Sequence, residues 1–312
     1  MQQKTQLKGV FILLITALIW GSSFVAQSVG MESVEAFTFN GIRTLLGAAV
    51  LIPFILIRDF IGNKKSPVPK EAKKKENKSL IIYGSIIGVI LCIASNLQQQ
   101  AFNYSTSGKI AFITAFYMLF VPFLGLFIRK KVPLLTWICV ALGAVGLYFL
   151  CITEEGLSGI NKGDILALLC AVFYAVHILA VEKFAPSIDG VKLSCVQFIV
   201  SGTLSVILMF IFESPDINAI KTAAVPILYS GVMSCGIAYT FQIIGQKYTE
   251  STVASLLMCM ESVFGVICGA LILKEMLSGR ELTGCVIMFV AIILSQLTDK
   301  ISAVFNKKKL KN

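Results

Sequence analysis

Long apolar runs, separated by short polar connections, repeat along almost the whole chain. A hydrocarbon core ~30 Å thick calls for about 20 apolar residues of helix. Runs of suitable length cover residues 9–29, 34–57, 79–101, 104–128, 133–152, 163–181, 191–212, 223–245, 252–273 and 282–299. The pattern predicts ten transmembrane helices, and the fold class is therefore an all-α polytopic membrane protein.

Composition supports this prediction. The 312 residues are 56% hydrophobic and only 14% charged, whereas soluble domains have about 25% charged residues. The net charge of +10 comes from basic residues between the apolar runs, where they set topology and meet anionic lipid. Nucleic acid is not an expected partner.

The distribution of basic residues predicts the orientation. With the N-terminus inside, 21 Lys and Arg side chains fall on the cytoplasmic side and 4 outside, which favours cytoplasmic termini in a bacterial inner membrane. Segment 58–78 is rich in lysine and reads as a mobile cytoplasmic linker. Residues 301–312 read as a basic cytoplasmic tail.

The two halves of the chain also resemble each other in sequence. A shift of 144 positions aligns the third to fifth runs with the eighth to tenth and matches Gln98 with Gln242, whereas the first and sixth runs correspond at an offset of 154. An odd number of helices in each half forces the halves into opposite orientations. We therefore expect two inverted five-helix repeats, in residues 1–152 and 159–300.

Cysteine and histidine give no sign of a metal site or cofactor. The nine cysteines fall within or beside the apolar runs without a Cys-x-x-Cys pair, so they read as small packing residues. His177 is the only histidine. The run 9–29 is too long for the core of a signal peptide and stays as the first helix.

Lys109 is the first candidate site residue, because it is the only ionisable group in the long run from Tyr104 to Ile128. A charge at the centre of a membrane helix costs ~2.5–3.5 kcal/mol on insertion scales unless it faces other helices or a wet cavity. Ser107 and Gly108 just before it favour a face packed against another helix. The alternative is a lysine that snorkels to the interface.

Glu261 and Arg43 are the next candidates. Glu261 is the only acid in the interior of a predicted span, and it suits a substrate amine or a proton; alternatively it forms a structural ion pair. Arg43 lies about nine residues into the second span, and its planar guanidinium suits a carboxylate or phosphate. A bridge between helices is an equally good interpretation of Arg43.

Several neutral side chains complete the candidate set. His177 could carry a proton, although a lone histidine on an apolar helix also serves as a hydrogen-bonded packing residue. Aromatic and amide side chains could grip a small polar molecule, or could simply join helices. The members expected to bind substrate are Trp20, Gln99, Tyr117 and Tyr239.

Short motifs in both halves resemble those of one family. They are Trp20-Gly21-Ser22-Ser23-Phe24, Arg43, Thr106-Ser107-Gly108-Lys109 with Phe112-Ile113-Thr114 and Val121-Pro122, Gly163-Asp164, and Glu261-Ser262-Val263 with Leu273-Lys274-Glu275. In this order, over residues 9–298, they resemble EamA-type members of the drug/metabolite transporter superfamily.

The resemblance implies a ten-helix inner-membrane carrier with two inverted repeats, commonly an exporter of amino acids, related metabolites or drugs. Two positions depart from it. Many relatives have proline where this chain has Ser262, which leaves a helix break there open. The first half ends in Lys130-Lys131 where the second has Lys274-Glu275.

These observations favour a secondary transporter that moves a small amino-acid-like or anionic metabolite or drug by alternating access. In this hypothesis Arg43 and Lys109 face a carboxylate, and Glu261 faces an amine or proton. No ATP-binding motif is present, and no paired catalytic groups suggest an enzyme. A membrane-embedded enzyme or a receptor without transport remains the alternative. The expected partners are a small-molecule substrate and the lipid bilayer, with a homodimer left open.

Overall fold

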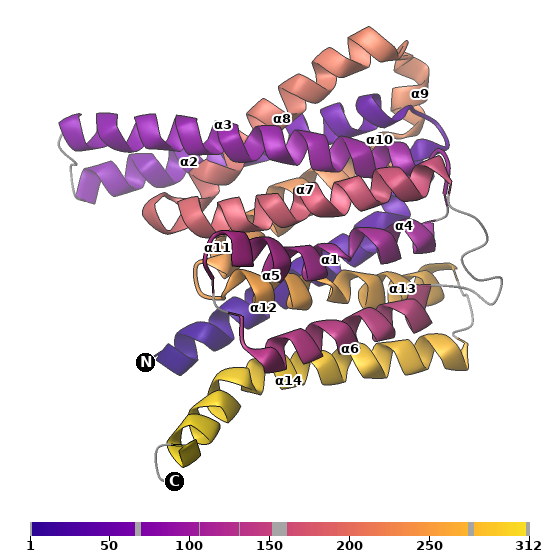
Figure 1. Ribbon diagram of the computed structural model, residues 1–312. Coiled ribbons are helices and arrows are strands. Elements are labelled where there is room, and N and C mark those ends of the chain that lie inside the picture. Colours follow the sequence, from indigo (N-terminus) through magenta and orange to yellow (C-terminus); the bar gives the residue numbers. More distant parts are fainter. Residues whose placement is uncertain are drawn as a thin grey trace.

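The computed structural model describes residues 2–65, 70–105, 107–130, 132–151, 161–273 and 278–309, and every regular element in these ranges is a helix (Figure 1). The long helices are α1 (Gln2–Met31), α2 (Ala36–Lys65), α3 (Lys70–Ala101), α6 (Leu134–Cys151), α7 (Lys162–Phe184), α8 (Gly190–Phe212) and α14 (Gly279–Lys309). The shorter helices are α4 (Ser107–Thr114), α5 (Tyr117–Phe127), η1 (Ala185–Ser187), α9 (Ile217–Thr222), α10 (Ala224–Tyr229), η2 (Ser230–Tyr239), α11 (Thr240–Gln246), α12 (Ser251–Met258) and α13 (Met260–Leu273).

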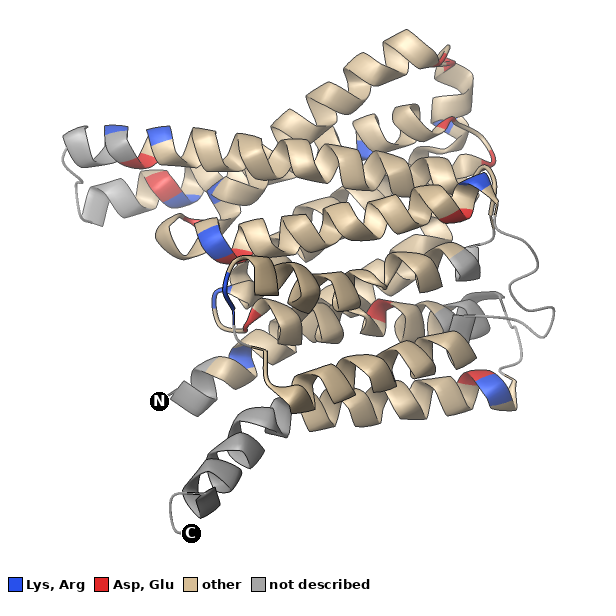
Figure 2. Cartoon of the chain, in the orientation of Figure 1, with Lys and Arg blue, Asp and Glu red and all other residues tan. Residues whose placement is uncertain are grey.

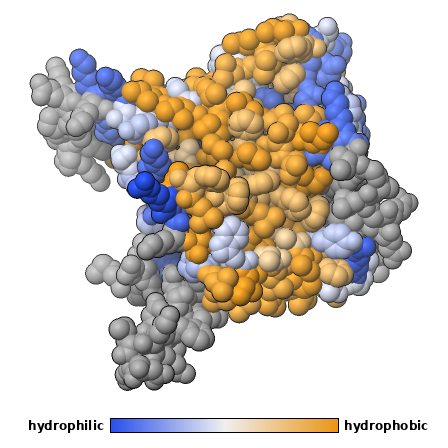
Figure 3. Space-filling view, viewed as in Figure 1, coloured by the Kyte–Doolittle hydropathy of each residue, from blue (hydrophilic) through white to orange (hydrophobic). Residues whose placement is uncertain are grey.

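Within the described residues, seven helical stretches are long and apolar enough to cross a membrane. They are Gln6–Met31, Ala36–Ile61, Glu76–Ala101, Ile110–Phe127, Lys162–Ser187, Gly190–Phe212 and Ala224–Gln246, and two shorter apolar helices cover Leu134–Phe149 and Ser251–Gly265. Apolar side chains such as Phe127, Phe210 and Val225 are exposed, and the face of the molecule seen in Figure 3 is mostly hydrophobic between its two ends. The chain is a multi-pass membrane protein, because only a bilayer makes such a surface favourable.

The interior carries many of the polar side chains. Asn40, Arg43, Gln99, His177 and Gln197 are each no more than 3% exposed. Since the bilayer core offers no hydrogen bonds, such groups lie against other helices or a wet cavity.

Two predicted spans are interrupted near their centres. The predicted helix 104–128 is wrong as one continuous helix, because α4 ends at Thr114 and α5 starts at Tyr117. The amides of Phe116, Met118 and Leu119 bond to carbonyls three residues earlier, as in a tightened turn. Pro122 does not account for this break, because it lies inside α5 and the carbonyl that its ring displaces, four residues earlier, is that of Met118.

The second interruption separates α12 from α13 at Cys259. The sequence left open whether the helix breaks at Ser262. A break does occur in this span, but it lies at Cys259, before Glu261. The Cys259 thiol donates a hydrogen bond to the Ala115 carbonyl over 3.6 Å. The two breaks therefore touch each other, although 144 residues separate Ala115 from Cys259.

Segment 58–78 differs from the mobile linker that the sequence predicts. Helix α2 continues to Lys65 and α3 begins at Lys70, whereas residues 66–69 lie outside the described residues. Lysine and glutamate favour helix, so both helices extend beyond their apolar runs (Figure 1). Helix α14 likewise continues through residues 301–309 of the predicted tail.

Helix α1 begins and α14 ends at the same end of the bundle, which we call the termini face (Figure 1). Here Arg58 on α2 pairs with Asp189 over 3.0 Å, and Asp59 pairs with Lys192 on α8 over 2.6 Å. Asp189 also caps α8 by accepting from the amides of Val191 and Lys192. Partial burial raises the pKa of Asp189, but the Lys192 amide and the Arg58 and Lys192 charges outweigh it, so the pKa lies below its ordinary value.

A further ion pair at the termini face joins Lys130, just after α5, to Glu182 on α7. The ion pairs of Arg58, Asp59, Lys130 and Lys192 thus gather at this face (Figure 2). At the opposite face, Glu213 accepts hydrogen bonds from the Phe37 amide and from the Thr38 amide and hydroxyl, at 2.7–2.8 Å. Ion pairs thus join α2 to α8 at one face, and hydrogen bonds to a carboxylate join them at the other.

Candidate functional site

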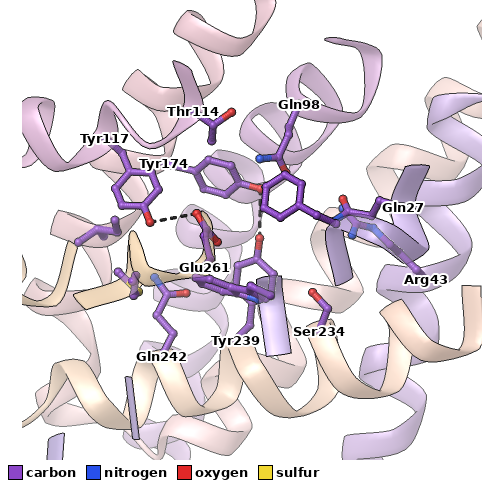
Figure 4. A pocket seen from close by; sticks show the side chains of 14 residues that line it. Gln27, Arg43, Gln98, Thr114, Tyr117, Tyr174, Ser234, Tyr239, Gln242 and Glu261 are labelled. Carbon is purple, nitrogen blue, oxygen red and sulfur yellow. Dashed lines mark hydrogen bonds between the residues drawn. The ribbon is translucent and has the colours of Figure 1, made fainter. Parts of the chain in front are cut away.

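A polar pocket lies in the middle of the bundle and is lined by helices from both halves of the chain (Figure 4). The space between its walls measures about 480 Å³ including its open side. Its lining residues are Trp20, Phe24, Gln27, Arg43, Gln98, Thr114, Tyr117, Tyr174, Ile178, Ser234, Tyr239, Gln242, Met258 and Glu261.

Arg43 supplies positive charge on one side of the pocket (Figure 4). Its side chain is 3% exposed, and its Nε donates to Asn40 Oδ1 over 3.0 Å. The guanidinium carbon lies 5.5 Å from the centre of the Phe39 ring. The side chain is therefore held about two turns from the start of α2, deep enough to be shielded from solvent screening.

Glu261 lies on another wall, in the first turn of α13. It accepts a hydrogen bond from the Tyr117 hydroxyl over 3.1 Å. No ion pair between Arg43 and Glu261 is recorded in the part of the chain that the structure describes. The pocket thus presents a cation and an acid that do not neutralise each other by contact.

Gly21 brings α1 against the helix that carries Glu261. A Cβ atom there would lie 2.6 Å from the Glu261 carbonyl oxygen and 2.7 Å from the Gly265 amide nitrogen. Only glycine permits this approach of two backbones. The neighbouring Trp20 thereby lies in the wall of the same pocket as Glu261.

Aromatic side chains form a connected wall. The rings of Trp20 and Tyr239 meet edge to face, with centroids 4.7 Å apart. The Tyr174 and Tyr239 hydroxyls lie 3.2 Å apart, and Tyr174 donates to Gln98 Oε1 over 3.3 Å. Tyr239 comes from the π-helical segment η2, whose wider turns are frequent at functional sites.

The structure brings together five of the predicted site residues. Arg43, Glu261, Tyr117, Trp20 and Tyr239 all line the pocket. Gln99 is buried but is not among the lining residues, whereas its neighbour Gln98 is. The side chain of Lys109 lies outside the described residues.

His177 lies beside the pocket and not in its wall. It is fully buried, its Nε2 lies 3.0 Å from Gln197 Oε1, and its ring meets Tyr239 edge to face with centroids 6.3 Å apart. This geometry fits a hydrogen-bonded packing residue, and a proton-coupling role would have to act through Tyr239 or Gln197.

Sequence reasoning missed several lining residues, notably Gln27, Thr114, Tyr174, Ser234 and Gln242. The repeat offsets could have found some of them. Tyr174 lies 154 positions after Trp20, and Gln242 lies 144 positions after Gln98. Gln27 and Ser234 carry no such signal, since their counterparts Val181 and Ile90 are apolar.

The described residues contain no cluster of three or more potential metal ligands. Instead the pocket offers hydrogen-bond donors and acceptors on opposite sides, with aromatic surface between them. Such a site can bind and orient a small polar molecule within a membrane-spanning bundle.

A multi-pass helical bundle around a buried polar pocket has the architecture of a membrane transporter. The chain belongs to the EamA-like transporter family, which matches residues 7–152 and 161–297, and it is thus a transporter of the drug/metabolite transporter superfamily.

Similar proteins carry transporter names. An "Uncharacterized transporter" of Archaeoglobus fulgidus is 28% identical over 91% of this chain and 84% of its own length. "Uncharacterized transporter YoaV" of Bacillus subtilis is 23% identical over 92% of this chain and 96% of its own. "Uncharacterized inner membrane transporter YedA" of Escherichia coli K12 is 24% identical over 62% of this chain and 59% of its own.

A solved structure titled "Crystal structure of protein" shares the fold. It superposes with a TM-score of 0.74 at 18% sequence identity, covering 93% of this chain and 96% of its own.

Proposed function

We propose that this protein is a secondary carrier that exports a small zwitterionic or anionic metabolite by alternating access. The observation that carries the proposal is that Arg43 and Glu261 are buried in the walls of one pocket without contacting each other. A buried guanidinium without a counter-ion calls for an anionic ligand. Export itself follows from the resemblance to EamA-type carriers.

The proposed architecture is ten spans in two inverted five-helix repeats, residues 1–152 and 159–300. The family matches one stretch in each half of the chain. Helices α2 and α8 begin 154 positions apart, at Ala36 and Gly190. Residues related by a pseudo-two-fold axis meet when they lie near it, and Tyr117 contacts Glu261, its counterpart 144 positions later.

Each half would then move against the other around the pocket. The two touching helix breaks, at Ala115 and Cys259, lie next to the pocket residues Thr114 and Met258, where a small change in backbone angle alters both walls. The bias of basic residues supports a cytoplasmic termini face. The lining residues of the pocket all come from one chain.

Substrate chemistry follows from the two charged walls. Arg43 would bind a carboxylate, and Glu261 with Gln242 would accept hydrogen bonds from an amine, or Glu261 would carry a proton. Lys109 would add a second cation. The aromatic wall between them would cover an apolar side chain.

Thermal stabilisation by three matched compounds tests this assignment, because a ligand that binds only the folded protein raises its stability. L-Leucine has both groups, 4-methylpentanoate lacks the amine and isopentylamine lacks the carboxylate. Arg43→Gln should abolish stabilisation by L-leucine and 4-methylpentanoate, which carry the carboxylate. Glu261→Gln should weaken stabilisation by L-leucine and isopentylamine, which carry the amine, and should leave 4-methylpentanoate unaffected. Arg280→Gln, far from the pocket, is the matched control.

Transport itself is tested by counterflow of labelled L-leucine and related zwitterions in proteoliposomes, with Arg43→Gln, Lys109→Ala and Glu261→Gln as variants. Saturable flux that all three variants retain at normal rates would remove these residues from the site. Chemical conversion without flux would indicate an enzyme, and binding without flux a receptor.

A further inference from the structure

We propose that Asn40 is a positioning residue that fixes the Arg43 guanidinium so that only its terminal N–H edge is presented to the pocket. The proposal rests on the role proposed above for Arg43 and adds the device that orients it. Asn40 lies one helical turn before Arg43 on α2 and is fully buried.

The orientation of the Asn40 amide is fixed by its neighbours. Arg43 Nε can only donate, so the Asn40 atom 3.0 Å away is the oxygen, Oδ1. Asn40 Nδ2 then faces Ser95 Oγ on α3 over 2.9 Å. The Ser95 hydroxyl gives its own proton to the Leu91 carbonyl over 2.7 Å, so it accepts from Asn40.

A third helix completes this arrangement. Ser205 Oγ on α8 lies 3.5 Å from Asn40 Nδ2 and accepts from Asn96 Nδ2 on α3 over 2.8 Å. Asn40 is therefore held by α3 and α8, helices from different halves of the chain, while it holds Arg43. A buried amide with partners on both sides has little freedom to rotate.

This arrangement limits how Arg43 can bind an anion. A guanidinium can pair with a carboxylate through Nε and one terminal nitrogen, or through its two terminal nitrogens. Asn40 occupies Nε, and the Phe39 ring lies against the guanidinium. The edge left for a ligand is the pair of terminal nitrogens, which matches a bidentate carboxylate or phosphate.

The test follows the Arg43 side chain directly. The chain contains four arginines, at positions 43, 58, 129 and 280, so nuclear magnetic resonance of the ¹⁵N-arginine-labelled full chain in nanodiscs gives few Nε–H signals. The Arg43 signal is the one lost in Arg43→Lys. In the wild type the Arg43 Nε proton should exchange slowly with water, and sodium acetate should change its chemical shift.

Asn40→Leu should bring that signal into fast exchange and weaken acetate binding at Arg43 roughly tenfold, the equivalent of about 1.4 kcal/mol. Asn40→Asp should restore slow exchange, because its carboxylate still accepts from Nε. Asn96→Leu is the matched control, a buried amide in the same cluster that does not contact Arg43, and should leave both readouts unchanged.

Unchanged Nε–H exchange in Asn40→Leu, or equal effects of Asn40→Leu and Asn96→Leu, would overturn the proposal. Neither readout depends on transport. If exchange responds as expected but acetate leaves the wild-type Arg43 signal unmoved, Asn40 positions Arg43 while the anion-binding role in the proposed function fails.

Discussion

The hydrogen bond between Tyr117 and Glu261 offers a quantitative test of the pocket geometry. The two side chains are 4% and 7% exposed, and the donor and acceptor oxygens lie 3.1 Å apart. Removing the donor by Tyr117→Phe leaves one carboxyl oxygen without this partner in a buried site. A hydrogen bond contributes about 0.5–1.5 kcal/mol between neutral groups and about 1.5–3 kcal/mol with a charged one.

We expect Tyr117→Phe to lower the free energy of unfolding by about 1–3 kcal/mol in the wild type and by almost nothing in a Glu261→Leu background. The coupling energy of this double-mutant cycle isolates the pair, because both backgrounds lose the same hydroxyl. Thermal unfolding of the purified protein in detergent measures it, at about 2–4 °C per kcal/mol or somewhat less for a chain of this length.

Tyr83→Phe on α3 is the control, since it removes the same atom from a ring that stacks on Phe184 at the edge of the bundle. If Tyr117→Phe lowers the free energy of unfolding equally in the two backgrounds, the hydroxyl acts on something other than Glu261. The hydrogen bond between Tyr117 and Glu261 in the pocket would then be wrong.

Three further outcomes follow from the packing and the charges. Asp189→Asn should lower the melting temperature at pH 7, and by progressively less as the pH falls below about 4; because the pKa of Asp189 is depressed in the fold, its stabilisation is fully present above the unfolded pKa of about 3.9 and is lost as pH falls through the lower folded pKa. Gly21→Val should cost about 1–3 kcal/mol by overpacking against α13, whereas Gly279→Val, with nothing within 4 Å, should be neutral in the same melts. Lys192→Gln should weaken the contact between α2 and α8 at the termini face by at most about 1 kcal/mol, measured as faster labelling of a cysteine placed at Val191.

The positions of many helices could be predicted because the thickness of the bilayer determines how long an apolar run must be to cross it. Predicted runs 163–181 and 191–212 agree closely with α7 and α8. The interruption before Tyr117, the break at Cys259 and the π-helical turns of η2 could not be predicted, because tertiary contacts decide them. Pro122 does not mark the first of these, since it lies inside α5.

The candidate site was only partly predictable. A charged side chain within an apolar run raises the free energy of membrane insertion, so Arg43 and Glu261 stand out from the sequence alone. Gln27 and Ser234 do not, because a single amide or hydroxyl in a span is inexpensive and common. Asn40 could not be recognised without knowing that its side chain faces Arg43 and not lipid.

The contact between α2 and α8 has ion pairs at one end and hydrogen bonds from neutral donors at the other. Ionic strength should therefore weaken the first end more than the second. Dissolved salt weakens attraction between partly exposed opposite charges within a Debye length of ~8–10 Å near physiological conditions. It acts far less on the neutral donors that Phe37 and Thr38 offer to Glu213. Adding potassium chloride should therefore weaken the ion pair between Asp59 and Lys192, while the hydrogen bonds to Glu213 at the opposite face stay intact.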